Sequence, residues 1–456
     1  SLSKSTHLSF AVWNLDSLPA RDFARLPLIE SLQSIYDFDL FCVCESMLTD
    51  NILNNDIVIN GFSNDPFRAD KAPGVRNGGV CLYYKEHLPL KQRVDLQKLP
   101  ETIVAEIKLG RKKIFLVLSY RHPNMSNDEV ILYMNSLAET YESISRENPY
   151  MTVICGDFNS RSPLFWEGDS ENFAGSLFSD LLISKNIEQL ISEPTHVRDD
   201  GSQSCIDLIC TDQPFVFMES GVMPSLDPCS KHNITHGKIS VNIPSPPPYK
   251  RKIWEYKSAN STKIRNELGN INWHELFTNL NVSEMTLLFT DLFLNVMSKH
   301  ITNKVVTFND KDAPWITPQV KTAILRNSRV YKKWVAKGRN PLHHEQVRKI
   351  QNDTNKLIKA AKLSYYSHLG CKLSDPSTGQ KQFWTAYKTL ANQKKNTNIP
   401  PIIKDGVYIS NFSQKASVFN EYFASQCEIN DNGSILPGYS PCSSQLSNID
   451  VSEENI

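Results

Sequence analysis

The chain of 456 residues is 40% hydrophobic and 10% aromatic, which is enough apolar material for two or more folded domains. Its 49 Lys and Arg residues balance 49 Asp and Glu residues, so the total charge by itself indicates no class of partner. No apolar run approaches the ~20 residues of a membrane-spanning helix, and we expect no membrane partner. Ten cysteines are few for this length, which favours reduced thiols in an intracellular protein.

Five short apolar segments in the first half of the chain each lead into polar side chains. Continuous apolar runs are typical of strands buried on both faces, and in α/β sheets functional groups collect just beyond the carboxyl ends of such strands. We therefore expect one site built from several strand ends. The segments are Leu8–Trp13 before Asn14 and Asp16, Leu40–Cys44 before Glu45, Ile114–Ser119 before Tyr120 and Arg121, Val153–Cys155 before Gly156, Asp157 and Asn159, and Cys205–Ile206 before Asp207.

A proline cluster divides the chain. Pro244 and the run 246–248 continue neither a strand nor a helix and favour an extended spacer, which places the end of the first domain near Asn242. The charge changes sign at the same place, because residues 1–249 carry 21 basic and 32 acidic side chains and residues 250–430 carry 28 and 13. A basic half beside an acidic half favours nucleic acid as a partner, with a merely solvated helical face as the equal alternative.

Beyond the spacer, apolar residues recur at steps of three and four, the period of an amphipathic helix. The stretch Lys321–Lys362 holds 12 basic and 2 acidic residues, which predicts long helices with a basic outer face. Pro314 and Pro318 frame its entry, and the turn-forming stretch Gly338–Pro341 predicts a break into two helices. Residues 429–456, rich in Asn, Ser, Gly and Pro, are typical of a loop or disordered tail.

The order of the motifs resembles that of the endonuclease/exonuclease/phosphatase superfamily and, more narrowly, the endonuclease of jockey-like non-LTR retrotransposon polyproteins. The resemblance covers nearly the whole chain, and its last three motifs lie in the segment that connects nuclease and reverse transcriptase in such polyproteins. The motifs are WNLDSL at 13–18, CESML at 44–48, GGVCLYYK at 78–85, YRHPN at 120–124, GDFNS at 156–160, EPTH at 193–196, CIDLI at 205–209, PPPY at 246–249, APWI at 313–316 and FNEYFA at 419–424.

The resemblance implies a site that uses Mg²⁺, or Mn²⁺ in its place, with Glu45 as a direct metal ligand. Asn14-Leu15-Asp16 matches an Asn-x-Asp of the AP-endonuclease branch, which implies a phosphate contact for Asn14 and a metal-side carboxylate for Asp16. Taken by themselves, Glu45 and Asp16 are also compatible with roles in a turn or a helix cap.

Asp157 and Asn159 carry the strongest local signal. If their segment is extended, alternate side chains point the same way and both reach one phosphate. The resemblance implies that Asp157 positions or helps to deprotonate the attacking water, that Asn159 hydrogen-bonds the phosphate, and that Tyr120 stabilises the developing charge. Arg121 is a further candidate for phosphate binding.

The resemblance also implies that His232 is the catalytic histidine and that Asp207 orients it through its ring N–H. The usual closing motif is Ser-Asp-His, whereas residues 230–232 read Ser-Lys-His. A like charge ~4 Å from the metal costs on the order of 4 kcal/mol at an effective dielectric of ~20. Three outcomes are therefore open for Lys231: its side chain swings away from the metal, it contacts a DNA phosphate, or it leaves the nuclease domain weakly active or inactive.

The fold expected from these features is an α/β domain of two packed mixed β-sheets flanked by helices, a four-layer sandwich, followed by a mainly helical basic segment. The predicted divisions are a nuclease-type domain at 5–244, a Pro-rich linker at 245–254, a basic connector at 255–428 towards a reverse transcriptase missing from this chain, and the tail at 429–456.

The function implied is Mg²⁺-dependent hydrolysis of DNA phosphodiester bonds, as in target-site nicking for retrotransposition, in the nucleus and cytoplasm. DNA is the expected target, and RNA of the element is a second partner for the basic helices. Two alternatives stay open: a phosphatase acting on small phosphoesters, and a nucleic-acid-binding remnant with weakened catalysis. Removing everything after Asn242 is expected to weaken binding and to leave the cleavage chemistry intact.

Overall fold

The computed structural model describes most of the chain, and its two compact units, divided between Asn411 and Phe412, are described separately. Most of the PPPY motif and the whole of the expected tail lie outside the described residues. No helix in the described part is long and apolar enough to cross a membrane. The described residues are 4–72, 74–198, 200–244, 249–256, 259–308, 313–339, 343–390, 402–405, 407–409 and 412–427.

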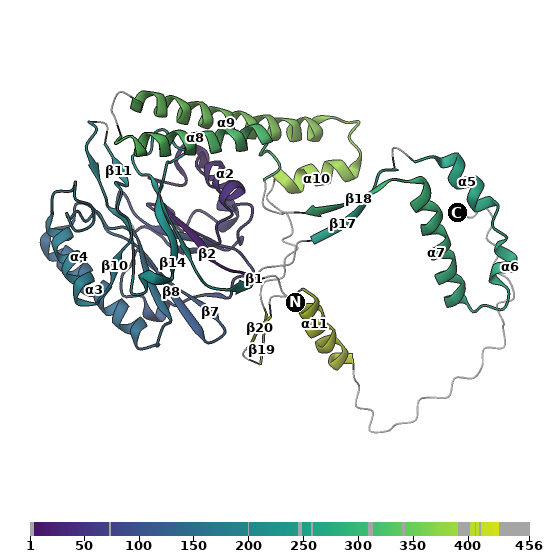
Figure 1. Cartoon of the computed structure of the whole chain (residues 1–456), viewed down its shortest axis with the longest axis horizontal. Helices are drawn as coiled ribbons and strands as arrows, with labels where there is room; N and C mark the ends of the chain where they lie inside the picture. The colour runs from purple at the N-terminus through teal and green to yellow at the C-terminus, as the bar shows by residue number, and fades with distance from the viewer. Residues whose placement is uncertain are drawn as a thin grey trace, which may run out of the picture. The chain divides into compact units, whose positions relative to one another are not determined.

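Two six-stranded mixed sheets form the centre of the first unit (Figure 1). The first sheet has the order β14-β15-β2-β3-β5-β4 and the second the order β10-β13-β9-β8-β7-β6. The strands of the first sheet are β14 (Phe217–Met223), β15 (Ile234–Ile239), β2 (Leu8–Asn14), β3 (Leu40–Cys44), β5 (Val80–Tyr84) and β4 (Phe67–Ala69). Those of the second are β10 (Glu188–Gln189), β13 (Asp207–Thr211), β9 (Met151–Asp157), β8 (Lys112–Tyr120), β7 (Thr102–Leu109) and β6 (Leu90–Gln92).

The side chains of β2 alternate between the two faces of the first sheet, which explains why an apolar layer lies on each side of it. Phe10 and Val12 face the second sheet and join the larger apolar cluster, whereas Ala11 and Trp13 face the opposite side and join another. Helices α3 (Asn127–Ser145) and α4 (Phe173–Ser184) contribute side chains to the larger cluster, and α2 (Leu26–Tyr36) covers the outer face of the first sheet. The expected pair of mixed sheets flanked by helices is thereby confirmed.

Strand directions bring the polar segment ends to one edge. β2 runs parallel to β3, and β8 runs parallel to β9, so the carboxyl ends within each pair coincide. β15 and β13 run antiparallel to β2 and β9, which brings their amino ends to the same edge. This arrangement corrects one expectation: Asp207 begins β13 instead of following a strand, because an antiparallel strand reaches this edge with its first residue.

The strand β9 also differs from the expectation that it stops at a glycine. It runs through Gly156, which has φ +144°, and ends at Asp157. A Cβ at Gly156 would lie 1.8 Å from the carbonyl oxygen of Ser119 on β8. Glycine is therefore required here by the close approach of two parallel strands, one residue before the carboxylate that they present.

The long helices predicted in the basic half form a hairpin of α8 (Pro318–Ala336) and α9 (His344–Ser374), with Gly338 in the left-handed region after α8. The hairpin packs on α2 as a further layer (Figure 1). Trp315, Ile324 and Ile358 are buried in the same apolar cluster as Trp13 and α2. Removing everything after Asn242 would expose this cluster, so we no longer expect the remaining fragment to keep its chemistry untouched.

The remaining elements frame the sandwich or lie in the second half. Strand β17 (Tyr249–Trp254) occupies the second part of the expected Pro-rich linker and pairs with β18 (Asn303–Phe308). The second unit contains α11 (Phe412–Cys427), which includes the FNEYFA motif. The others are β1 (Lys4–Ser5), α1 (Ala20–Phe23), β11 (His196–Val197), β12 (Gln203–Ser204), β16 (Ile243–Pro244), β17 (Tyr249–Trp254), α5 (Ser261–Gly269), α6 (Trp273–Phe277), α7 (Val282–His300), β18 (Asn303–Phe308), α10 (Gln380–Leu390), β19 (Ile402–Lys404) and β20 (Val407–Ile409), with short 3-10 turns at Asn54–Ile57, Val94–Leu96 and Pro214–Val216.

Candidate active site

His232 and Asp207 form a close pair at the shared edge of the two sheets. His232 Nδ1 lies 2.9 Å from Asp207 Oδ2 and 3.2 Å from Oδ1. Asp207 is fully buried, and the His232 side chain is 14% exposed. A carboxylate on Nδ1 fixes the ring orientation and leaves the second ring nitrogen to exchange a proton.

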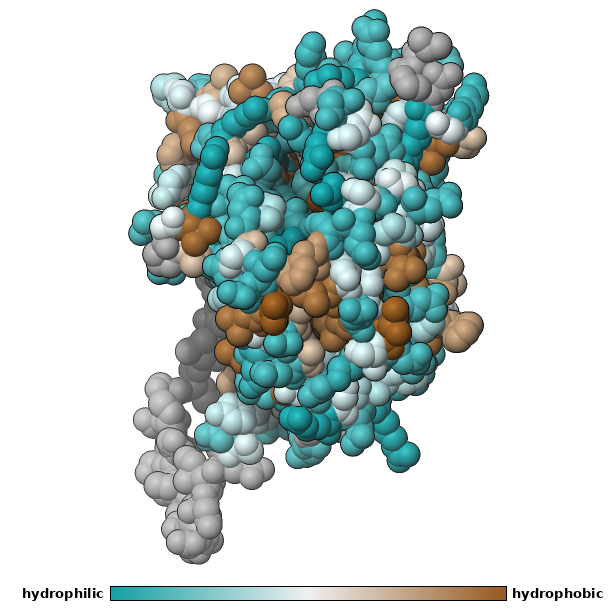
Figure 2. Space-filling model, turned by 90° about the vertical axis from the view of Figure 1, so that its left-hand side faces the viewer, coloured by the Kyte–Doolittle hydropathy of each residue, from teal (hydrophilic) through white to brown (hydrophobic). Residues whose placement is uncertain are grey.

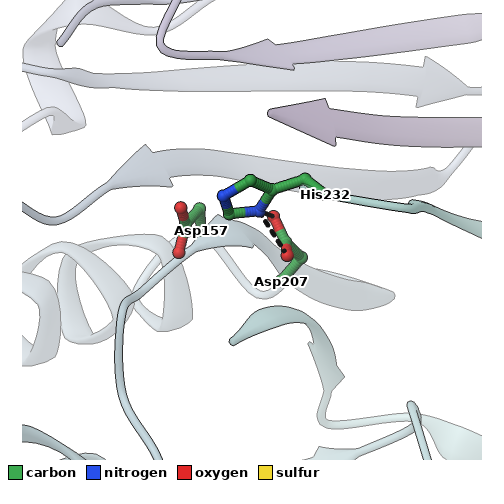
Figure 3. Close-up of side chains that lie close together, drawn as sticks. All are labelled: Asp157, Asp207 and His232. Atoms are coloured by element: carbon green, nitrogen blue, oxygen red, sulfur yellow. Dashed lines mark hydrogen bonds and ion pairs between the residues drawn. The ribbon is translucent and has the colours of Figure 1, made fainter. Parts of the chain in front are cut away.

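Asp157 faces that second nitrogen. Figure 3 shows the far side of the His232 ring turned toward the Asp157 carboxylate, with Asp207 on the opposite side. One ligand atom from each of the three residues lies within 4.8 Å of the others. β13 pairs with β9 so that Asp207 lies directly opposite Asp157, which explains why two residues 50 positions apart reach the same ring.

Glu45, Asn14 and Tyr120 form a second group, which Asn14 links to Asp157. Asn14 Nδ2 donates to Glu45 Oε1 at 2.9 Å and to Asp157 Oδ2 at 2.8 Å. The Tyr120 hydroxyl donates to the same Glu45 oxygen at 3.0 Å. Tyr120, Glu45, Asn14 and Asp157 therefore form one chain of hydrogen bonds at the ends of β8, β3, β2 and β9, and Asp157 lies beside the His232–Asp207 pair.

Glu45 has φ +49°, a left-handed conformation that costs a non-glycine residue roughly 1–2 kcal/mol. Neighbouring backbone bonds hold it there, because Glu45 O accepts from Ser17 N at 2.8 Å and Ser46 N donates to Gly79 O at 3.0 Å. The turn moves the carboxylate out of the β3 register and into the gap between the sheets. Only 8% of the residue is exposed.

Burial and charge change the proton affinities of this group. Burial and the nearby Asp207 raise the pKa of Asp157 to about 7. Burial alone would lower the pKa of His232, but Asp207 and Asp157 raise it to about 9. Burial, Glu45 and Asp157 raise the pKa of the Tyr120 phenol well above its ordinary value, so this hydroxyl stays a hydrogen-bond donor.

Asn159 departs from the extended conformation assumed for it. It has φ +48°, and its Nδ2 donates to Arg121 O at 2.8 Å. The turn also aims its backbone N–H at Asp157 Oδ1, at 2.9 Å. Asn159 therefore braces Asp157 through a tight turn instead of repeating its direction along a strand.

Arg121 and Asp16 are not brought to the buried carboxylates. The Arg121 guanidinium is buried and donates to the backbone oxygens of Phe158, His122 and Asn159. Asp16 is exposed, and its carboxylate lies 4.0 Å from Arg25. Arg121 thus supports the turn after β9, and Asp16 lies at the rim.

Lys231 is exposed, and its backbone oxygen accepts from Val197 N at 2.9 Å. Its charge acts on His196 at the rim. Burial, His232, Arg198 and Lys231 lower the pKa of His196 to about 4. Exposure alone does not select among the three outcomes for this lysine, which stay predictions.

Two supporting groups have no assigned role in the sequence prediction. Thr195 Oγ1 accepts from the backbone N–H of Ile206 and of Asp207, at 3.1 and 3.0 Å, and so anchors the start of β13. His122 Nε2 lies 3.0 Å from buried Glu101, and its ring contacts the Tyr120 ring edge-on. Thr195 lies within the EPTH motif and His122 within the YRHPN motif. The sequence therefore shows both motifs, but it assigns neither residue a chemical role.

The oxygen and nitrogen atoms present at the site are suitable ligands for a divalent cation. Glu45 Oε1 accepts two hydrogen bonds, and no described residue donates one to Oε2, which leaves this oxygen to a hard cation. The cluster of Asp157, Asp207 and His232 offers a second, mixed oxygen and nitrogen set. Both sets lie at the same edge of the sheets.

The side of the molecule that carries β11 is the one shown in Figure 2. It is hollowed in its upper half, and hydrophilic residues line the hollow, whereas apolar residues gather across the middle of this face. Such a polar hollow suits an ionic ligand better than an apolar one.

Part of the chain matches the model of a known protein family. Residues 114–236 match the model of a family described as endonuclease-reverse transcriptase. The matched stretch contains Tyr120, Asp157, Asp207 and His232. The match confirms the resemblance to endonucleases of the endonuclease/exonuclease/phosphatase superfamily. No curated protein matches the chain.

Several solved structures are similar to about half of the chain. The endonuclease domain of TRAS1, a telomere-specific non-LTR retrotransposon, is 19% identical and covers 52% of this chain and 99% of its own, with a TM-score of 0.40. An AP endonuclease from Leishmania major is 14% identical over 52% of this chain and 88% of its own, with a TM-score of 0.45. The catalytic domain of Xenopus laevis APE2 is 15% identical over 52% and 94%, with a TM-score of 0.40.

Proposed function

We propose that this protein is a metal-dependent endonuclease that hydrolyses DNA phosphodiester bonds. The observation that carries the proposal is the continuous group formed by Tyr120, Glu45, Asn14, Asp157, His232 and Asp207. It contains a histidine oriented by a carboxylate and able to accept a proton, and a second carboxylate with an oxygen left for a metal ion. It also contains an amide and a phenol that donate hydrogen bonds. These are the parts that phosphodiester hydrolysis requires.

In this mechanism the neutral form of His232, which prevails above its pKa of about 9, accepts the proton of the attacking water at the ring nitrogen that faces Asp157. Asp207 holds the opposite nitrogen, so the ring keeps its orientation while its charge changes. Asp157 holds the water beside this nitrogen, and with a pKa of about 7 it also exchanges a proton near neutrality. Asn159 keeps Asp157 in place through its backbone N–H.

The phosphate is bound by the donors at the ends of β2 and β8. The Asn14 amide and the Tyr120 hydroxyl both donate to Glu45 Oε1, so a cation held by this carboxylate would release the two donors to the phosphate. Glu45 would hold Mg²⁺, or Mn²⁺ in its place. The bound metal supplies charge neutralisation at the phosphate. Lys231, on the exposed rim, would add positive charge near a flanking DNA phosphate.

The biological setting of the proposal rests on the motif order together with the endonuclease-reverse transcriptase match. A jockey-like element would use such a nick at its target site to expose a 3′-hydroxyl for reverse transcription. We therefore propose a nuclear and cytoplasmic protein whose partners are target DNA and, through the basic helices, the RNA of the element. The divisions at 5–244, 245–254, 255–428 and 429–456 stay predictions of the order along the chain, and the α8–α9 hairpin of the third division packs on the first.

A direct test offers the full chain two kinds of substrate. Supercoiled plasmid and a set of small phosphoesters, including nucleotides and inositol phosphates, are incubated with Mg²⁺ or with EDTA. The proposal predicts open-circular plasmid with Mg²⁺ alone and no released phosphate. Phosphate release without nicking would indicate a phosphatase, and plasmid binding that is identical with Mg²⁺ and EDTA, without nicking, would indicate a binding remnant.

A further inference from the structure

The His232–Asp207 pair is carried by two segments with little secondary structure. One segment, residues 193–206, leads into Asp207, and the other, residues 224–233, contains His232. They meet at a backbone bridge between His196 and His232 and through Asn233 N, which donates to Thr195 O at 2.7 Å. Neither segment lies in a sheet interior. Their relative position therefore depends on these contacts and on the elements packed against them.

Tyr331 on α8 contacts Asn233, the residue that makes the second of these contacts. Asn233 Nδ2 donates to the Tyr331 hydroxyl at 3.1 Å. Asn233 directly follows His232, and the same residue bonds to Thr195, whose hydroxyl accepts from Asp207 N. Tyr331 is only 5% exposed, so its hydroxyl is a buried partner and not a solvated one.

Arg339, just after α8, reaches the other segment. Its guanidinium donates to Gln203 Oε1 at 3.1 Å and to Glu193 Oε2 at 3.2 Å. The Arg339 side chain is 13% exposed, and it spans the two sides of the β11–β12 hairpin. Figure 1 shows the ends of α8 and α9 lying above β11.

The second helix of the hairpin holds the turn before His232. Gln351 Nε2 donates to Ser225 O at 2.8 Å and to Asp227 O at 3.2 Å, and Asn355 Nδ2 donates to Leu226 O at 3.1 Å. The carboxylate of Asp227 in turn accepts from Arg25 Nε at 2.8 Å. Apolar packing alone would dock the hairpin on α2, so these polar contacts are a separate feature of its loop-facing side.

We propose that the α8–α9 hairpin completes the active site, with Tyr331 and Arg339 as positioning residues that hold the two segments carrying His232 and Asp207 in register. The inference deepens the proposed function, because the pair that it positions is the one assigned to water activation. Neither residue touches the reacting atoms. Each acts through one neighbour, Tyr331 through Asn233 and Arg339 through the β11–β12 hairpin.

The test compares the full chain with Tyr331→Phe, which removes one hydroxyl and keeps the ring, and with Arg339→Gln, which removes the forked donor. Tyr365→Phe is the matched control, since Tyr365 packs on the same hairpin against the apolar cluster without a hydrogen bond to either segment. Arg339→Lys keeps the charge and one donor and serves as the conservative variant. Two quantities are measured: amide hydrogen exchange across 193–206 and 224–233 without metal, and kcat and KM for plasmid nicking.

We expect exchange in both segments to rise about fivefold in Tyr331→Phe and in Arg339→Gln, in line with the loss of one buried hydrogen bond, and to stay unchanged in Tyr365→Phe. We expect kcat to fall on the order of tenfold with KM unchanged, and Arg339→Lys to lie in between. Wild-type exchange in both segments, even with a lowered melting temperature, would overturn the proposal. If the parent chain cuts no DNA, the proposed function fails, while the exchange measurement still decides whether the hairpin holds the pair.

Discussion

Asn14 shows how much one residue contributes to the site. Its amide nitrogen has two hydrogens, and both are used, one on Glu45 and one on Asp157. The residue is fully buried at the end of β2. The same amide therefore separates two buried carboxylates that would otherwise repel each other, and it fixes the spacing between the metal side and the water side of the site.

The Asp207–His232 pair makes stability depend on pH in the metal-free protein. The folded-state pKa of His232 is about 9, above its ordinary 6.5, so the stabilisation from its proton is fully present below pH 6.5 and is lost as pH rises through 9. The shift corresponds to about 3 kcal/mol of unfolding free energy. Urea unfolding in EDTA across this range should show the loss.

Asp157 adds to this trend at lower pH. Its folded-state pKa is raised from 3.8 to about 7, so its ionisation is unfavourable in the folded protein. The free energy of unfolding therefore also falls as pH rises from 3.8 to 7. Asp207→Asn is the control for the upper window, since it removes the partner that holds the His232 proton. A parent and an Asp207→Asn variant with the same pH dependence between 6.5 and 9 would contradict the assignment.

Lys231 leads to a second prediction at this scale. Because it is exposed and acts on His196, Lys231→Asp should leave the Mg²⁺ concentration for half-maximal nicking unchanged. It should weaken DNA binding, since an exposed cation near the site is replaced by an anion. Titrations of Mg²⁺ and of salt on the two proteins separate these effects. A much lower Mg²⁺ requirement in the variant would show that the lysine opposes the metal.

At the scale of elements, the sequence predicts some strands well and others poorly, for a physical reason. The apolar runs ending at Asn14, Glu45, Tyr120 and Asp157 mark strands correctly, because burial on both faces requires apolar residues. Strand direction leaves no such mark, so Asp207 is misplaced relative to its strand. The left-handed turn at Asn159 is equally invisible, since asparagine also occurs in extended segments.

The α8–α9 hairpin shows the same limit of prediction from the sequence. Its two helices and the break at Gly338 follow from periodicity and turn residues, because helical faces must alternate with the 3.6-residue repeat. What the apolar face packs against is not encoded in that repeat. The sequence therefore suggests a separate basic connector, whereas Ile324 and Ile358 are buried against the first sheet and α2.

This packing predicts a shared unfolding transition. Ile358 is fully buried, so Ile358→Ala should lower the unfolding free energy by about 2–5 kcal/mol. Leu363→Ala on the same helix, at a site 70% exposed, is the matched control and should cost little. Urea unfolding followed by far-UV circular dichroism should move as one transition. Two separated transitions, with only the smaller one shifted, would show that the hairpin unfolds independently of the sandwich.

At the scale of the whole molecule, the zero net charge conceals an acidic sandwich and a basic second half. The hairpin brings part of that basic charge onto the sandwich. Lys332 and Lys333 are exposed on α8 next to buried Tyr331, which contacts the residue after His232. The arrangement places positive charge beside the proposed site, where it can oppose the repulsion between an acidic domain and DNA.

Salt dependence measures this contribution. If both lysines contact phosphates, the double variant Lys332→Gln and Lys333→Gln should flatten the slope of log K against log salt by about 0.9 per contact on duplex DNA. Binding of a labelled duplex in EDTA, followed by fluorescence anisotropy at several salt concentrations, gives the slope. An unchanged slope would assign these lysines to a solvated face.

The central claim is that this chain cuts DNA with the His232–Asp207 pair, and one measurement addresses it most directly. Initial rates of plasmid nicking with Mg²⁺ are compared for the full-length parent, His232→Ala and Asp207→Asn, with circular dichroism to show that each is folded. A positioned acid–base group contributes about 10²–10⁴ in rate, so both variants should lose roughly two decades or more. Nicking by His232→Ala at the parent rate would contradict the account.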